Sequence, residues 1–302
     1  MLNWGLLGLA FAGTVWSAPV GKVKELQALK VEPQVLQQLQ VLNLPPSPES
    51  KLGASELLET LSSKNDVERE ELIVSLLQAG HFPNFLRHLK PIRVEGRGHQ
   101  ISYWVMPDYL SIGSEDDFLL VPLNWINTRK LAQAWGFYIP TPRMVDTIYQ
   151  QAERVIWPKT FRPGPEMGSM ATIQAHNDWI SAQRYLYGDQ EVLTAGHKKD
   201  IVVSRRLYQQ TDRIAIYGWQ NIRDGEPIQP LSLWHGERYA DYSHGIRLVA
   251  RWVLVDGEIM PLSQVLADPK LAGLLSHEGT LDLERVMRTP ETISVLAQNL
   301  TH

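Results

Sequence analysis

Two histidine-glycine pairs, His235-Gly236 and His244-Gly245, lie within residues 233–247, which we call the histidine segment. An imidazole transfers protons near neutral pH, a carboxylate can fix its tautomer, and a serine hydroxyl can act as nucleophile or proton donor. A guanidinium can stabilise an oxyanion or bind a carboxylate. This interpretation assigns catalysis to His235, Asp241, Ser243, His244 and Arg247, and substrate contacts to Trp234 and Tyr242. The alternative is a structural network of buried polar groups.

A second cluster, the run Gly-His-Lys-Lys-Asp at residues 196–200, precedes an expected strand. Alternation along that strand predicts that His197 and Lys199 face one way and that Lys198 and Asp200 face the other. The functional interpretation gives proton transfer to His197 and the binding of a carboxylate or phosphate to a lysine, with Lys198, Lys199 and Asp200 as substrate-binding residues. A solvated turn is the alternative. A shared proton-transfer site requires His197 to lie within hydrogen-bond or one-water reach of the histidine segment.

The histidine segment resembles part of the L,D-transpeptidase signature, in which a histidine-glycine precedes a serine-histidine-glycine-cysteine-x-arginine run. The matching residues are His235, Gly236, the run 243–245 and Arg247, within thirteen positions. Ile246 stands where that family has its nucleophilic cysteine, and the interval between the two histidines is short. The chain contains no cysteine at all, so we do not assign it to that family.

The histidines could also bind a metal ion. Zinc accepts nitrogen and oxygen ligands without cysteine, and four histidines with Asp200 or Asp241 would suffice as ligands. These histidines are His176, His197, His235 and His244. No His-Glu-x-x-His or His-x-His run is present, so we expect no metal and no other cofactor. His176 itself is expected to be a hydrogen-bonded helix residue beside the face formed by Ile173, Asn177, Ile180 and Arg184.

The chain has ten tryptophans and ten tyrosines, more than a core of this length needs. An exposed aromatic ring can stack on a sugar or another flat ligand, although packing in the core is the alternative for any one of them. Six tryptophans are expected near strand ends or loops: Trp104, Trp125, Trp135, Trp157, Trp219 and Trp234.

The pattern of expected helices and strands predicts an α+β fold with a mostly antiparallel sheet and flanking helices, in one domain over residues 66–302. Helix starts are indicated by the capping box Asn65 to Glu68 and by proline after an N-cap residue, and hairpin turns by Asp-Gly pairs. The proline starts are Thr141-Pro142, Asp268-Pro269 and Thr289-Pro290, and the turns are Asp224-Gly225 and Asp256-Gly257. Strands are expected at 92–94, 101–106, 118–123, 201–203, 214–217, 228–233 and 248–255, and a helix at 170–187. Residues 234–242 are expected to cross between two strands, with Gly236 and Gly245 allowing close backbone approach.

Residues 1–17 have an apolar run too short for a membrane span and end in small residues, which is typical of a secretory signal peptide. Residues 18–65 are expected to form a helical lead-in and a proline-rich linker. Absence of cysteine fits an exported bacterial protein. The net charge of -4 and the pI near 6.1 provide no broad basic field for nucleic acid. We expect no stable transmembrane span in the mature chain.

Together these features favour an exported, periplasmic or extracellular hydrolase or transferase that acts on a cell-envelope polymer such as peptidoglycan. The alternative is a non-catalytic envelope or glycan-binding protein whose polar cluster is a rigid network. The two hypotheses differ structurally. Catalytic histidines should line an open cleft, whereas a structural network should be sealed and fully hydrogen-bonded.

Overall fold

Antiparallel pairing dominates the computed structural model of the chain, which describes residues 43–185 and 191–288. The expected signal peptide, residues 18–42 of the lead-in and the Thr289-Pro290 helix start lie outside the described residues. The expected α+β fold is confirmed: antiparallel strands form most of the sheets, and helices flank them. No helix within the described residues is long and apolar enough to cross a membrane.

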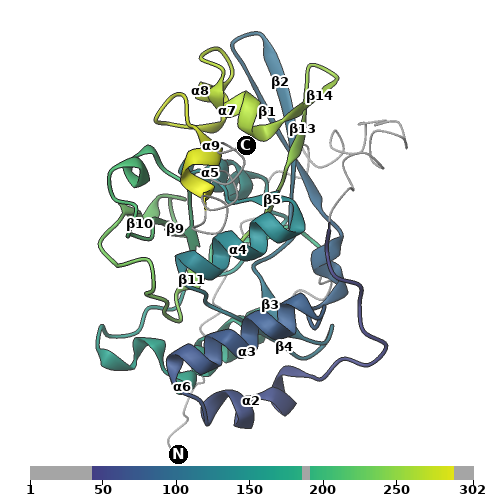
Figure 1. Cartoon of the computed structure of the whole chain (residues 1–302), viewed down its shortest axis with the longest axis vertical. Helices are drawn as coiled ribbons and strands as arrows, with labels where there is room; N and C mark the ends of the chain where they lie inside the picture. Colours follow the sequence, from purple (N-terminus) through teal and green to yellow (C-terminus); the bar gives the residue numbers. More distant parts are fainter. Residues whose placement is uncertain (1–42, 186–190, 289–302) are drawn as a thin grey trace, which may run out of the picture. The chain divides into compact units, whose positions relative to one another are not determined.

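A six-stranded antiparallel sheet holds two long hairpins, which extend together at the top of Figure 1. Its order is β14-β13-β2-β12-β5, with β1 also paired to β2. Asp256 and Gly257 both have positive φ at the turn between β13 and β14, as an Asp-Gly hairpin requires. The strands are β1 (Lys90–Gly96), β2 (His99–Val105), β5 (Phe137–Tyr138), β12 (Val249–Ala250), β13 (Trp252–Val255) and β14 (Glu258–Pro261).

A four-stranded sheet, in the order β10-β9-β8-β11, carries both histidine clusters. The expected hairpin at Asp224-Gly225 joins β9 to β10, and the histidine segment then crosses from β10 to β11 at the other edge. The strands are β8 (Lys199–Ile201), β9 (Ile216–Gln220), β10 (Pro227–Ser232) and β11 (His244–Gly245). Two further pairs are β3 (Ser111–Gly113) with β4 (Phe118–Leu120) and β6 (Arg154–Val155) with β7 (Thr194–Ala195).

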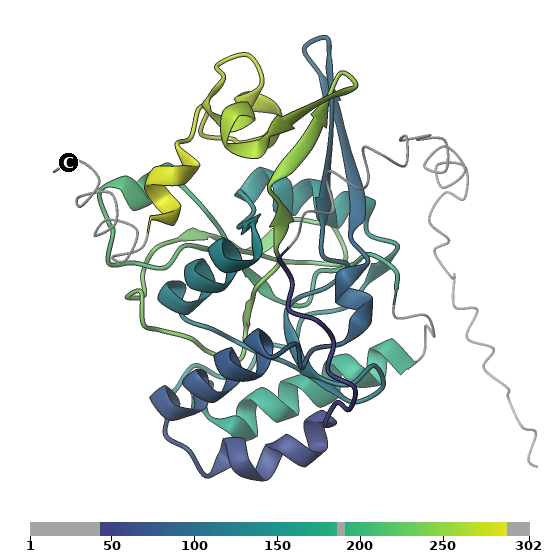
Figure 2. The same ribbon diagram turned by 45° about the vertical axis from the view of Figure 1, so that its right-hand side comes forward.

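Three helices lie together at the end opposite the long hairpins, in both ribbon views: α2 (Ala54–Ser62), α3 (Asp66–Gln78) and α6 (Met170–Tyr185) (Figures 1 and 2). The amide of Asn177, on α6, joins this layer to β4 by accepting from the N–H of Leu120 and donating to the carbonyl of Phe118. The buried side chains of α2 belong to the same hydrophobic core as those of α3. The folded unit therefore includes residues before Asp66.

The remaining helices surround the sheets, and their ends follow the sequence signals. Asn65 and Glu68 form the expected capping box, and Thr141 caps α5 directly before Pro142. Asp268-Pro269 does not start a helix directly, because Asp268 caps the end of α7 and α8 begins only at Ala272. These helices are α4 (Trp125–Trp135), α5 (Pro142–Gln151), α7 (Leu262–Ala267), α8 (Ala272–Leu275) and α9 (Leu283–Met287), with short 3-10 turns at Asn84–Arg87, Pro165–Gly168 and Arg205–Tyr208.

Candidate functional site

Parallel pairing of β8 with β11 brings the run 196–200 beside the histidine segment. Lys199 pairs with His244, and Asp200 pairs with Gly245. The N–H of Lys199 donates to the carbonyl of Ser243 at 2.7 Å. Two clusters that are far apart in sequence therefore share one edge of the four-stranded sheet, as a common site requires.

The expected alternation along the run 196–200 is not observed. The chain bends at residues 196–198, and β8 begins only at Lys199, so strand geometry does not apply to the whole run. Tyr109 contacts both ends of the run: its ring meets His197 edge-on with centroids 4.9 Å apart, and its hydroxyl donates to Asp200 at 2.7 Å. Of the four side chains assigned to this cluster, only Lys199 remains partly exposed.

The imidazole of His197 is fully buried against a carboxylate and a guanidinium. Its Nε2 lies 3.2 Å from Oδ1 of Asp108, whose Oδ2 pairs with Arg184 of α6. Burial lowers the pKa of His197 to about 4 despite the opposing effect of Asp108. For Asp108, burial acts upward on the pKa, but Arg184 and His197 outweigh it and hold that pKa well below its usual range. The side chain of His197 therefore bonds to these groups and not to a side chain of the histidine segment.

Asp241 organises the turn that precedes β11. Its Oδ1 accepts from the N–H and the hydroxyl of Ser243, at 2.7 and 2.6 Å, and its Oδ2 accepts from the hydroxyl of Tyr239 at 2.9 Å. All the donors are local, as in the side-chain turns that aspartate commonly forms. The hydroxyl of Ser243 is thus bonded to the carboxylate and not to an imidazole, so a serine–histidine pair is not assembled in this conformation.

Two titratable groups of the run 196–200 have pKa values near neutrality. Burial lowers the pKa of Lys198 to about 7, against the opposing effects of Asp241 and Asp108, and its Nζ donates to the carbonyl of Tyr242. Burial also raises the pKa of Asp200 to about 7, against the opposing effects of Arg247 and Tyr109. Groups that titrate near the working pH are suited to proton transfer and are found preferentially at functional sites.

His244 and His176 are fully buried, and neither ring nitrogen of either residue has a hydrogen-bond partner among the described residues. Burial lowers the pKa of His244 to about 4 and holds that of His176 well below its usual range. Both imidazoles are therefore neutral at pH 7. The expectation of a hydrogen-bonded His176 is not met, although the expected buried face of α6 is present at Ile173, Asn177, Ile180 and Arg184. A buried polar group without a partner costs stability, so two such groups in one cluster need an explanation.

Arg247 and Gly245 join the cluster to the neighbouring chain. The guanidinium of Arg247 donates to the carbonyls of Met106 and Thr194 at 2.8 and 2.6 Å and lies over the ring of Tyr109. A Cβ at Gly245 would come within 2.6 Å of Lys198 and 2.7 Å of Tyr109, so this position requires glycine, as expected. Gly236 has no comparable crowding, since its nearest neighbour would be 3.9 Å away.

The partly exposed side of the cluster is formed by His235, Tyr239 and Lys199. The rings of His235 and Tyr239 are stacked with centroids 3.8 Å apart, and Tyr239 also meets the ring of His244 edge-on at 5.7 Å. Trp234, beside them in sequence, is 82% exposed, as a stacking residue must be. Tyr239 therefore lies between a surface histidine and the buried His244 and Asp241.

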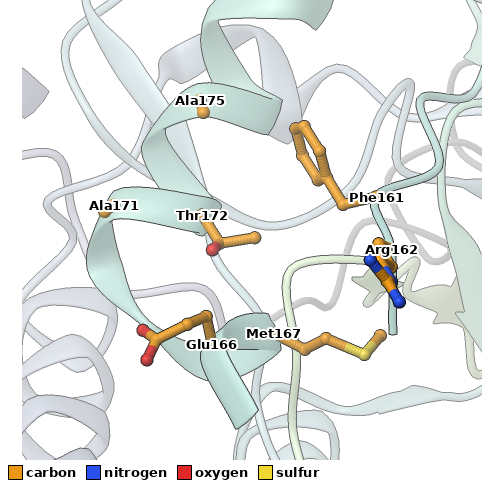
Figure 3. A pocket seen from close by; sticks show the side chains of 7 residues that line it. All are labelled: Phe161, Arg162, Glu166, Met167, Ala171, Thr172 and Ala175. Atoms are coloured by element: carbon orange, nitrogen blue, oxygen red, sulfur yellow. The ribbon is translucent and has the colours of Figure 1, made fainter. Parts of the chain in front are cut away.

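A pocket of about 250 Å³ lies between α6 and the segment 161–167 (Figure 3). Phe161 lines this pocket, and its ring contacts those of His176 and Tyr242, with centroids 6.2 and 5.0 Å away. The N–H of Phe161 donates to the hydroxyl of Tyr242 at 2.8 Å. The pocket is lined by Phe161, Arg162, Glu166, Met167, Ala171, Thr172 and Ala175. The ring of Phe161 thus separates the pocket from the buried rings of His176 and Tyr242.

Sequence reasoning missed Asp108, Tyr109 and Phe161. Asp108 had one available signal, because it is a carboxylate within an otherwise uncharged stretch that directly follows a buried strand. Tyr109 and Phe161 carry no comparable signal. The described part of the chain contains no group of three or more histidine, aspartate or glutamate side chains placed to hold a metal ion.

Four of the six tryptophans considered as stacking residues are core residues: Trp104, Trp125, Trp135 and Trp219. Trp157 and Trp234 are exposed, and Trp179 on α6 is a third exposed indole. Comparison of the chain with models of known protein families, with curated proteins and with solved structures gave no match.

Proposed function

We propose that this chain is an exported hydrolase or transferase that acts on a cell-envelope polymer such as peptidoglycan. Its catalytic centre is the buried cluster formed by His176, His197 and His244 and the side chains around them. The observation that supports the proposal most is the pair of buried imidazoles, His244 and His176, that have no hydrogen-bond partner in the part of the chain that the structure describes. Retaining such groups lowers stability, and proteins retain destabilising groups chiefly where function needs them. Lys198 and Asp200, with pKa values near 7, lie in the same cluster.

In this proposal the neutral His244 acts as the general base. It takes a proton from an attacking water, and it returns that proton to the leaving group as general acid. Asp241 accepts from the hydroxyl of Ser243 and so fixes the turn that leads into β11 and His244. Lys199 and His235, which are partly exposed, contact an anionic group of the substrate in this proposal. The cluster is closed, so catalysis requires a covering ring such as Tyr239 or Phe161 to move.

Incubation of the mature protein with purified cell-wall material, followed by chromatography and mass spectrometry of the soluble fragments, tests this proposal. Release of defined fragments supports it, and a His244→Leu variant serves as the matched control. Intact cell-wall material after incubation, with the wild-type protein folded, contradicts it.

The alternative is a non-catalytic envelope or glycan-binding protein. Two observations favour it. His176, His197 and His244 are fully buried and line no open cleft. Asp241 and Arg247 direct their hydrogen bonds to neighbouring protein groups, as in a rigid structural network. This function predicts binding of cell-wall material without any released fragment.

Export is a separate part of the proposal. It rests on the apolar run and the small residues before Pro19. Mass spectrometry of protein recovered from its native host should show a chain that begins near Ala18. A cytoplasmic protein that retains residues 1–17 would contradict export and weaken the choice of an envelope substrate.

A further inference from the structure

Two exposed tryptophans, Trp157 and Trp179, lie at one surface that the catalytic proposal does not use. Trp157 is 54% exposed and Trp179 is 42% exposed. Gln183, one turn after Trp179 on α6, links them: its Oε1 accepts from the N–H of Trp157 at 2.9 Å, and its Nε2 donates to the carbonyl of Trp157 at 3.1 Å. Both indoles are therefore held by ordered backbone. Both indoles are partly open to solvent, and the ammonium of Lys159 lies over one face of Trp179.

This surface continues along α6 to the pocket beside Phe161. Successive helical residues are about 100° apart, so Trp179 and Gln183 share a face with Ala175 and Thr172, which line the pocket. The segment 157–167 runs beside that face in the opposite direction, because Trp157 contacts Gln183 and Phe161 contacts His176. Thr172 and Gln183 are separated by about 16 Å along the axis. The surface is thus elongated and has an aromatic end and a pocket end.

Cationic side chains lie at both ends of this surface. Nζ of Lys159 lies 4.7 Å from the ring centroid of Trp179, and Arg162 lines the pocket (Figure 3). Arg162 forms no ion pair with another described residue, although Glu166 lines the same pocket. A ligand that carries a carboxylate could pair with Arg162.

A ligand built of flat rings, each with an apolar face and polar edges, matches these features. A sugar ring stacks on an indole through its C–H face, while its hydroxyls reach amide and ammonium groups at the ring edge. We propose that the face of α6 beside the segment 157–167 binds the glycan backbone of the envelope polymer, with sugars on Trp157 and Trp179 and a carboxylate-bearing substituent at Arg162. This inference rests on the proposed function for its choice of polymer. In this binding mode the glycan reaches Phe161, whose ring separates the pocket from His176.

Titration with two soluble probes tests the inference through tryptophan fluorescence and calorimetry. One probe is peptide-free glycan strands from purified peptidoglycan, which carry carboxylates, and the other is neutral chitin oligomers. The double variant Trp157→Ala/Trp179→Ala should weaken binding of both probes by about tenfold or more, equivalent to about 1.4 kcal/mol. Arg162→Gln should weaken binding of the carboxylate-bearing strands only.

Tyr185→Ala is the matched control, because Tyr185 is an aromatic residue on the same helix, 89% exposed and about 120° around the axis from Trp179. It should leave both affinities unchanged. Absence of binding by the folded wild-type protein overturns the inference, and so does equal loss in the control. A change in oligomeric state in the double tryptophan variant, without a change in glycan affinity, would identify a self-association surface and also overturn it.

Binding and turnover separate this inference from the proposed function. Tryptophan-dependent binding without fragment release supports the glycan surface and contradicts the catalytic proposal. Fragment release that is equally fast in the double tryptophan variant supports catalysis and overturns the glycan surface.

Discussion

The hydroxyl of Tyr109 donates a hydrogen bond of 2.7 Å to Oδ2 of Asp200, and both side chains are buried. Tyr109 follows the end of β2, and Asp200 lies in β8, so this bond ties the chain leaving the six-stranded sheet to the four-stranded sheet. The same ring meets His197 and lies beneath the guanidinium of Arg247. Tyr109 thus contacts three side chains of the buried cluster: His197, Asp200 and Arg247.

Tyr109→Phe should lower the free energy of unfolding by about 1 to 3 kcal/mol, because it removes a donor from a buried carboxyl group. Urea denaturation at neutral pH measures this loss. Tyr103→Phe is the control, since the hydroxyl of Tyr103 donates to the neutral carbonyl of Met144 over 3.3 Å, and a smaller loss is expected. Equal stability of the wild type and Tyr109→Phe would show that Asp200 does not depend on this bond.

Lys198 should make stability increase with pH. Its pKa is about 7 in the folded protein, whereas an unfolded lysine keeps its proton to about pH 10. Between these values the unfolded state binds more protons, so the free energy of unfolding rises as pH rises. In Lys198→Met this increase should be smaller when urea denaturation is compared at about pH 7 and about pH 9. Lys130→Met, at an exposed position of α4, should keep the wild-type increase. Identical pH profiles for the wild type and Lys198→Met would contradict a buried, titrating amine.

Phe161→Ala should connect the pocket to His176. The ring of Phe161 lines the pocket and contacts the imidazole of His176, so its removal should admit solvent to that ring. Hydrogen–deuterium exchange at the histidine C2 position, followed by mass spectrometry, should become faster at His176. Met167→Ala is the control, because Met167 lines the same pocket and its side chain makes no ring contact with His176. Unchanged exchange in Phe161→Ala would mean that another element covers His176.

Local signals in the sequence predicted much of the fold. Capping at Asn65 and Thr141 and the Asp256-Gly257 turn depend on neighbouring residues only, and the structure contains each of them. The end of α7 at Asp268 was not predicted, because aspartate before proline fits both a helix start and a helix end followed by a turn.

The proximity of the two clusters could be predicted from the sequence, but their internal bonds could not. An unusual density of histidine, lysine and aspartate marked the two clusters that β8 and β11 bring together. The partners of these groups depend on tertiary contacts: Asp108 reaches His197 from the end of β2, and Arg184 reaches Asp108 from α6. Strand alternation failed over residues 196–198 because a bend precedes β8. Gly196, which has a φ of 98°, was the local signal for this bend.

His244→Leu tests the central claim most directly, because the imidazole of His244 is buried and has no hydrogen-bond partner within residues 43–185 and 191–288. Leucine removes the unpartnered polar nitrogens and keeps most of the volume, so the thermal midpoint should stay the same or rise. If His244 transfers a proton in the reaction, release of cell-wall fragments should fall by about a hundredfold to ten-thousandfold on the same protein preparation. A variant that is at least as stable as the wild type and nearly inactive is the predicted result. A folded variant that releases fragments at the wild-type rate would contradict a catalytic role for His244.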